Sequence, residues 1–292
     1  GGRGASGAAS LLVDGDPMPS WNIQLAQTER LLARDGAVAS LVRDRNAFLF
    51  GNVVPDIFVG YMVPGVMDPI PYRITHFAKQ EPIPKPRERE FWSTYVAPLA
   101  EHISATGEGD VPLVTLSAER EFLNRTHYPA RYEGTDAMPE DLLVARGVAA
   151  EPDQRAVQRS VLDLVLGAWA HLLADNLWNT RVNEYLDAHG GKPSEEFRIK
   201  KQGDFDHFGR LHHLTAAPQG TPRLLAACER FPQYAIPAPY VYASIGVIHE
   251  TVRTNGGTSE HVPYQLLTDE FFNETFDEVL EATEDAISER LG

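Results

Sequence analysis

Apolar residues recur every three or four positions over most of the chain, a spacing typical of amphipathic helices. The longest such segment begins at Asp153 and ends near His189, where Gly190-Gly191-Lys192-Pro193 stops it. Its apolar stripe, followed at heptad spacing, consists of Val157, Val161, Leu164, Ala168, His171, Asp175, Trp178 and Val182. Two ionisable side chains therefore occupy positions that otherwise face the core. Burying an unpaired carboxylate costs several kcal/mol, so we expect a cationic partner or a metal ion beside Asp175.

Helical spacing also marks much of the remaining chain. Residues 21–46 predict two helices separated at Gly36, with Ser20 as the N-cap of the first. The last helix follows Thr268, a suitable N-cap, and its apolar face contains Phe272, Phe276, Val279, Thr283 and Ile287. Further helices are expected over residues 88–104, 117–124, 137–149, 194–214, 221–230 and 239–253.

The segment from Phe48 to Pro86 differs, because Gly and Pro recur too often in it for long helices. It predicts an ordered loop region with short helical pieces. The sequence has no β-hairpin signal and no repeat with the period of about 20 to 50 residues that marks repeat architectures. We therefore expect an all-α fold, a single multi-helix domain over residues 18–292. Residues 1–17 have the composition of a linker or an expression remnant.

Composition narrows the function classes. No apolar run reaches the ~18 residues of a membrane span, which predicts a protein without a transmembrane segment. With 26 Lys and Arg against 41 Asp and Glu, the net charge of −15 argues against duplex nucleic acid as a partner. The single cysteine, Cys228, excludes a thiolate cluster, so a metal ion would need His and carboxylate ligands. No secretion signal is visible, which favours a cytoplasmic location, although a cleaved signal would leave no trace.

Two short motifs outside the long helix add ligand types: Gly51-Asn-Val-Val-Pro55-Asp56 and Arg73-Ile-Thr75-His76. Each has an ordinary explanation by itself, since Pro-Asp in a loop often forms an Asx turn and a lone histidine is often solvated. Their order changes the interpretation. Pro-Asp, then Thr-His, then Gly-x-x-x-His-x-x-x-Asp on an apolar helix resembles the zinc-dependent phospholipase C family, a helical fold shared with single-strand-specific zinc nucleases. The resemblance extends upstream to the first helix and covers residues 18–182.

The resemblance implies that Asp56, His76, His171 and Asp175 form one metal centre. Two imidazoles and two carboxylates suit zinc, and also manganese or iron. The family pattern has a histidine in the first helix that serves a second metal, whereas this chain has Gln24 there. One ion is therefore expected, and Trp21, which lies inside the chain, is interpreted as a packing residue.

A centre of this kind implies hydrolysis of a phosphoester, either a phospholipid head group or a smaller soluble phosphodiester, with Asp56 as the general base. The cations nearest to these motifs are Arg73, Lys79, Lys85 and Arg87. A solvated surface is the alternative explanation for them, and it is the favoured one for Lys85 and Arg87. The residues expected to bind substrate are Arg73, Gln24, Asn179 and His207. Asn179 could equally complete the polar network of the core.

Several other polar residues have structural alternatives. Asp204, Asp206 and His207 could form a second site or simply cap a helix, and His127 could line the substrate mouth or lie in a loop. His249 fits a core position. A non-catalytic helical binding or scaffold protein, with a structural or lost metal site, is the alternative function. A nuclease of the same fold is a third hypothesis, which the net charge of −15 disfavours.

Overall fold

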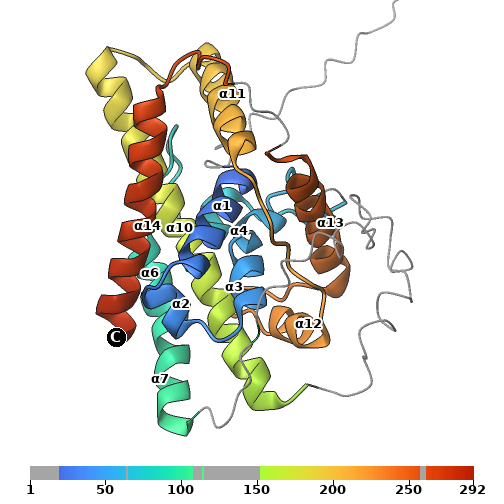
Figure 1. Ribbon diagram of the computed structural model, residues 1–292. Coiled ribbons are helices and arrows are strands. Elements are labelled where there is room, and N and C mark those ends of the chain that lie inside the picture. The colour runs from blue at the N-terminus through green and yellow to red at the C-terminus, as the bar shows by residue number, and fades with distance from the viewer. Residues whose placement is uncertain (1–19, 64, 108–113, 115–151, 257–260) are drawn as a thin grey trace, which may run out of the picture.

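The computed structural model describes residues 20–63, 65–107, 114, 152–256 and 261–292. Within these ranges every regular element is helical, and the β-bridge between Asp44 and Val114 stands outside any strand (Figure 1). The prediction of a mainly α-helical protein is confirmed. The helices expected at 117–124 and 137–149, and also His127, lie outside the described residues.

The central element is α10 (Gln154–His189), a helix of 36 residues. Asp153 caps its start by accepting from the backbone of Arg155 and Ala156, and Gly190, with a φ of 67°, ends it. Helices α3, α12 and α14 all pack against it. Figure 1 shows α10 running through the middle of the molecule, with α14 on one side and α12 and α13 on the other. The long helix expected from the apolar stripe is therefore present.

The N-terminal region contains α1 (Trp21–Ala33), α2 (Ala37–Leu41) and α3 (Arg45–Gly51). Gly36 separates the first two helices as predicted. The second predicted helix is divided, since α2 ends at Leu41 and α3 begins at Arg45. Asp44 caps the start of α3 by accepting from the Ala47 amide. Ser20 occupies the predicted N-cap of α1, but its hydroxyl makes no capping hydrogen bond there.

The Pro- and Gly-rich segment contains only short helices, as expected. These are α4 (Val54–Ile57) and α5 (Tyr72–Thr75), joined by an irregular connection. The helix predicted over residues 88–104 is present as α6 (Glu88–Phe91), a π-helical turn (Trp92–Val96) and α7 (Ala97–Thr106). The π-turn has no signal in the spacing of apolar residues.

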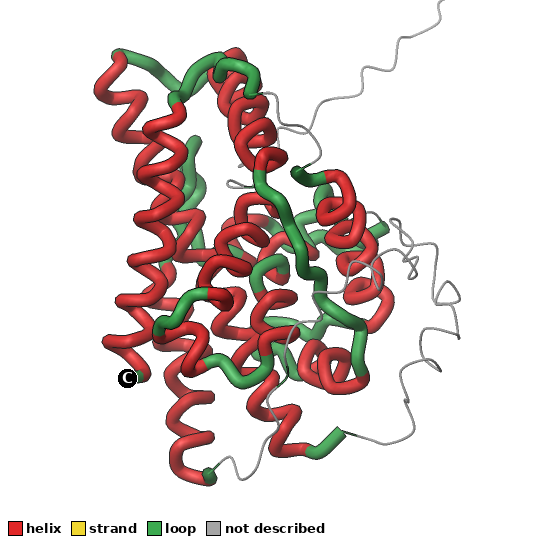
Figure 2. Tube along the Cα trace, in the orientation of Figure 1, coloured by secondary structure: helices red, strands yellow, loops and turns green. Residues whose placement is uncertain are grey.

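The C-terminal half contributes α11 (Glu195–Leu211), α12 (Pro222–Glu229), α13 (Ala238–Thr254) and α14 (Asp269–Leu291). Thr268 caps α14 as predicted, by accepting from the Phe271 amide. Figure 2 shows these helices joined by extended loops. No helix in the described part of the chain is long and apolar enough to cross a membrane.

Candidate metal centre

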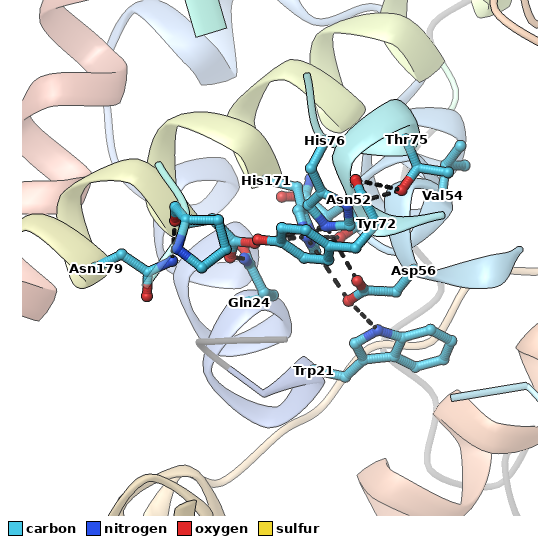
Figure 3. A network of polar contacts seen from close by, with 12 residues as sticks. Trp21, Gln24, Asn52, Val54, Asp56, Tyr72, Thr75, His76, His171 and Asn179 are labelled. Carbon is cyan, nitrogen blue, oxygen red and sulfur yellow. Dashed lines mark hydrogen bonds and ion pairs between the residues drawn. The ribbon is translucent and has the colours of Figure 1, made fainter. Parts of the chain in front are cut away.

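The predicted ligand residues come together in the interior (Figure 3). Asp56 lies on α4, His76 follows directly after α5, and His171 and Asp175 project from one face of α10. All four side chains are completely buried, with 0% of their surface exposed. Segments far apart in sequence thus bring two imidazoles and two carboxylates to one point.

The distances within this group are short. Nε2 of His76 lies 3.2 Å from Nε2 of His171 and 3.2 Å from Oδ1 of Asp56. The potential ligand atoms of Asp56, His76 and His171 all lie within 4.8 Å of one another. Oδ2 of Asp175 lies 3.4 Å from Nε2 of His171 and 3.6 Å from Nε2 of His76. This spacing allows one cation to be bound by several of these atoms.

His171 is oriented by the backbone. Its Nδ1 lies 2.6 Å from the carbonyl oxygen of Asn52, which can only accept, so we assign the proton to Nδ1. A proton on Nδ1 leaves Nε2 as the nitrogen that faces the cluster, where it would bind a cation through its lone pair once its own proton is lost. Asn52 is held in place because Gly51 packs directly on Gly167 of α10. Main-chain support of this kind for the outer ring nitrogen is usual for a histidine that binds metal.

His76 is oriented by its neighbours on α5. Oγ1 of Thr75 donates to the carbonyl of Tyr72 and lies 2.8 Å from Nδ1 of His76, from which it can accept. The ring of Tyr72 stacks on the imidazole, with 3.7 Å between centroids and 15° between planes. Both arrangements leave Nε2 of His76 facing the other three side chains.

Neutral donors hold the second carboxylate. Nε2 of Gln24 donates to Oδ1 of Asp175 at 3.0 Å, and the Tyr72 hydroxyl donates to Oδ2 at 3.0 Å. Gln24, expected to bind substrate, is 1% exposed and is directed at Asp175. Its place in the structure is therefore beside the cluster rather than on an accessible surface.

Asp56 has one occupied and one open oxygen. The indole Nε1 of Trp21 donates to Oδ2 at 2.9 Å, so Trp21 does more than pack. Oδ1 has no hydrogen-bond partner among the described residues. A buried carboxylate oxygen without a donor is costly unless a cation or a proton reaches it. The chemistry of the cluster therefore fits a bound divalent cation.

The pKa values of the buried side chains also indicate that the cluster attracts positive charge. Burial acts to lower the pKa of His171, but the carboxylates of Asp175 and Asp56 outweigh it and raise this pKa to about 9. Burial acts to raise the pKa of Asp56, yet the imidazoles of His171 and His76 leave this pKa below its ordinary value. Burial raises the pKa of Asp175. The two carboxylates thus attract positive charge to Nε2 of His171, which a proton or a metal ion can supply.

The other predicted substrate residues lie in different surroundings. Arg73 is exposed on α5 and lines a cavity of about 120 Å³ that Tyr72 also borders. Nδ2 of Asn179 donates to the carbonyl of Pro84 at 2.6 Å. This contact agrees with the alternative role for Asn179, a place in the polar network of the core. His207 contacts His261 and accepts from the Val262 amide at 3.2 Å.

Asp204 and Asp206, which were considered together with His207 as a possible second site, have structural roles. Asp204 accepts from three consecutive backbone amides, those of Gln265, Leu266 and Leu267, and so fixes the loop before α14. Asp206 accepts from Gln202, one turn earlier on α11. Both contacts are structural, but neither residue caps a helix as the alternative predicted, because both lie within α11 and Ser194 caps its start.

Sequence reasoning missed Tyr72 as a partner of the cluster. It lies four residues before His76, a spacing that can bring two side chains together over one helical turn. Asn52 and Thr75 lie within the two short motifs, but the motifs do not show that the Asn52 carbonyl contacts His171 or that the Thr75 hydroxyl contacts His76. These contacts form only in the folded chain. No protein-family model matches the chain, and comparisons with curated proteins and with solved structures found no match either.

Proposed function

We propose that the protein is a metal-dependent phosphoester hydrolase, similar to the zinc-dependent phospholipases C in fold and in site. The observation that carries this proposal is the convergence of Asp56, His76, His171 and Asp175, whose facing nitrogen and oxygen atoms lie 3.2 to 3.6 Å apart. Helical packing alone does not require two imidazole Nε2 atoms 3.2 Å apart between two carboxylates. A divalent cation gives such an arrangement a function.

These residues would hold one cation, and zinc fits best, with manganese or iron(II) as alternatives. When bound, the cation would polarise a phosphoryl oxygen and acidify a water molecule. Asp56 is the candidate general base, because Trp21 fixes its Oδ2 while its Oδ1, 3.2 Å from Nε2 of His76, faces the cluster. Gln24 and Tyr72 hold Asp175 in its orientation. A single ion is proposed because Gln24 offers a neutral amide on the outer side of Asp175.

The substrate proposed is a small phosphodiester, either soluble or the head group of a phospholipid. The net charge of −15 gives the protein little attraction for an anionic bilayer, which favours the soluble substrate. The same charge disfavours single-stranded nucleic acid.

A second candidate function is a binding or scaffold protein in which the cluster is structural. The complete burial of all four residues favours it, as do the hydrogen bonds that both Asp175 oxygens already accept, from Gln24 and from Tyr72. Such a network can stabilise a core without any chemistry.

Elemental analysis of the purified full chain, combined with turnover of bis(p-nitrophenyl) phosphate, separates the two. The hydrolase is expected to carry about one equivalent of metal, and His76→Ala should abolish both metal binding and turnover. His102→Ala, at an exposed position of α7, is the matched control and should change neither. Stoichiometric metal without hydrolysis of any phosphoester in a broad panel would support the scaffold. Digestion of single-stranded DNA in the presence of zinc would instead favour a nuclease.

A further inference from the structure

A positively charged hollow adjoins the cavity that Tyr72 borders. The smaller cavity has a volume of about 120 Å³ and the larger about 640 Å³, and Lys79 and Glu81 line both. The larger one lies between α10, represented by Leu173 and Asn176, and the segment from Lys79 to Glu90. The two cavities are therefore adjacent, with Lys79 and Glu81 between them.

The charge of this hollow is opposite to that of the chain as a whole. Lys79, Lys85, Arg87 and Arg89 line the larger cavity, in a protein with a net charge of −15. Its acidic residues are Glu81, Glu88 and Glu90, and two of these already have cationic partners.

Glu88 is held by the guanidinium of Arg290, at 2.8 and 3.0 Å, and Glu90 pairs with Arg87 at 2.9 Å. Lys79 and Lys85 form no ion pair with any described residue. An anion entering the cavity would therefore meet two lysines whose charge is not already neutralised, opposed only by Glu81.

The backbone on both sides of Lys85 is held in place before any ligand binds. Lys85 lies between Pro84 and Pro86, whose carbonyls accept from Asn179 at 2.6 Å and from Asn176 at 2.8 Å. Two α10 amides, one of them next to Asp175, thus tie the backbone on both sides of Lys85 to the helix that carries the metal centre. Holding the backbone of a binding residue in advance reduces the entropy lost on binding.

We propose that this hollow is an anion subsite that binds a second phosphate group of the substrate, in addition to the phosphoester at the metal centre. The inference rests on the proposed function, which places the reacting phosphoester at the metal centre. The two lysines indicate where the second phosphate group binds. The substrate class is thereby a phosphoester that carries a further phosphomonoester. Tyr72 connects the two places, because it lines the smaller cavity and donates to Asp175.

Binding of inorganic pyrophosphate to the metal-free full chain, measured by calorimetry, tests the subsite independently of catalysis. The double variant Lys79→Gln/Lys85→Gln is expected to weaken binding about ten-fold or more, since each removes a charge-assisted contact. Glu81→Gln should change affinity in the opposite direction and tighten binding. Lys192→Gln, at an exposed lysine beyond α10, is the charge-matched control and should leave the affinity unchanged. Equal affinities for all four proteins would overturn the proposal.

Turnover distinguishes this inference from the proposed function. With the metal-loaded protein, the double lysine variant should raise KM for a p-nitrophenyl phosphodiester that carries a phosphomonoester, and leave KM for bis(p-nitrophenyl) phosphate unchanged. Hydrolysis of both substrates with identical KM values in both proteins would leave the hydrolase intact and refute the subsite. Lysine-dependent pyrophosphate binding without any turnover would support the subsite and refute the hydrolase.

The second phosphate could be carried by a soluble molecule or by a lipid. Sedimentation with phosphatidylcholine vesicles that contain phosphatidic acid identifies the carrier. Lysine-dependent sedimentation would support the subsite with a lipid carrier, and lysine-dependent binding of pyrophosphate alone would support it with a soluble one. Sedimentation that the lysine substitutions do not alter, without lysine-dependent pyrophosphate binding, would contradict it.

Discussion

Gly51 and Gly167 face each other where the end of α3 meets α10. A Cβ atom built on Gly167 would lie 2.3 Å from the carbonyl oxygen of Phe48, and one on Gly51 would lie 2.2 Å from that of Leu164. The obstacles are backbone atoms, which cannot move aside cheaply. Because Asn52 follows directly and accepts from His171, this close approach sets the position of one imidazole of the metal centre.

Gly167→Ala should therefore destabilise the protein by about 3 kcal/mol, the upper part of the range for overpacking, and should also weaken metal binding. Urea denaturation measures the free energy of unfolding, and competition with a chelator measures the affinity. Gly203→Ala is the matched control, because nothing lies within 4 Å of its added Cβ on α11. That control should be neutral or stabilise by about 0.5–1 kcal/mol, and similar losses in both variants would contradict the tight contact.

Tyr72→Phe should weaken metal binding by about 10- to 100-fold, the usual effect of removing a group that orients a ligand. The substitution removes the hydroxyl that donates to Asp175 and retains the ring that stacks on His76. Tyr185→Phe is a matched control, since its hydroxyl donates to the carbonyl of Leu266, in a different contact. An unchanged metal affinity in Tyr72→Phe would contradict a role of the Tyr72 hydroxyl in orienting Asp175, since Gln24 remains as the second donor.

The ion pair between Glu88 and Arg290 joins α6 to the C-terminal end of α14. Glu88 also accepts from the indole of Trp169 at 2.6 Å. Burial acts to raise the pKa of Glu88, but the hydrogen bonds from Arg290 and Trp169, together with the charge of Arg290, leave this pKa below its ordinary value. Arg290→Met leaves this carboxylate without its cation, so we expect a loss of about 3 kcal/mol in the free energy of unfolding. Arg253→Met removes an exposed pair with Glu250 and should cost less than about 1 kcal/mol. Comparable losses would argue that the first pair is solvated.

The long helix and its two polar residues could be predicted because the information is local. Asp175 follows His171 by four residues, and the surrounding apolar positions fix the face on which both lie. Thr268 is a similar case, since an N-cap is recognised from its neighbours along the chain. Asp56 and His76 were found differently, from their order relative to the helix pair and the resemblance that this order carries.

The contacts around the cluster could not be predicted in the same way. Gln24 and Asp175 are separated by 151 positions, and their hydrogen bond exists only because the helices pack in one particular way. Trp21 was interpreted as a packing residue because it lies inside the chain, and nothing near it in the sequence indicates that its indole donates to Asp56. The sequence left two roles open for Asn179, substrate binding and part of the polar network of the core. Its hydrogen bond to the carbonyl of Pro84 supports the structural role.

His212 lies between two aromatic rings at the end of α11. It stacks on Phe276, with 4.9 Å between centroids, and meets the edge of Phe208 at 4.7 Å. Its Nε2 is buried without a hydrogen-bond partner among the described residues. Burial, with a smaller contribution from the charge of Arg30, lowers the pKa of His212 to about 4. The folded protein therefore binds a proton at this site more weakly than the unfolded chain does.

Stability should depend on pH for this reason. In the unfolded chain a histidine has a pKa of about 6.5, so the contribution of His212 is complete above that pH and is lost as the pH falls towards 4. The loss by linkage is about 2–3 kcal/mol. His212→Phe keeps the aromatic contacts and cannot be protonated, so it should flatten the decline in urea stability between pH 7 and 4. His102→Phe, at an exposed site, should retain the decline of the unaltered protein. A parallel decline in all three proteins would mean that another group, and not the buried imidazole, takes up the proton on unfolding.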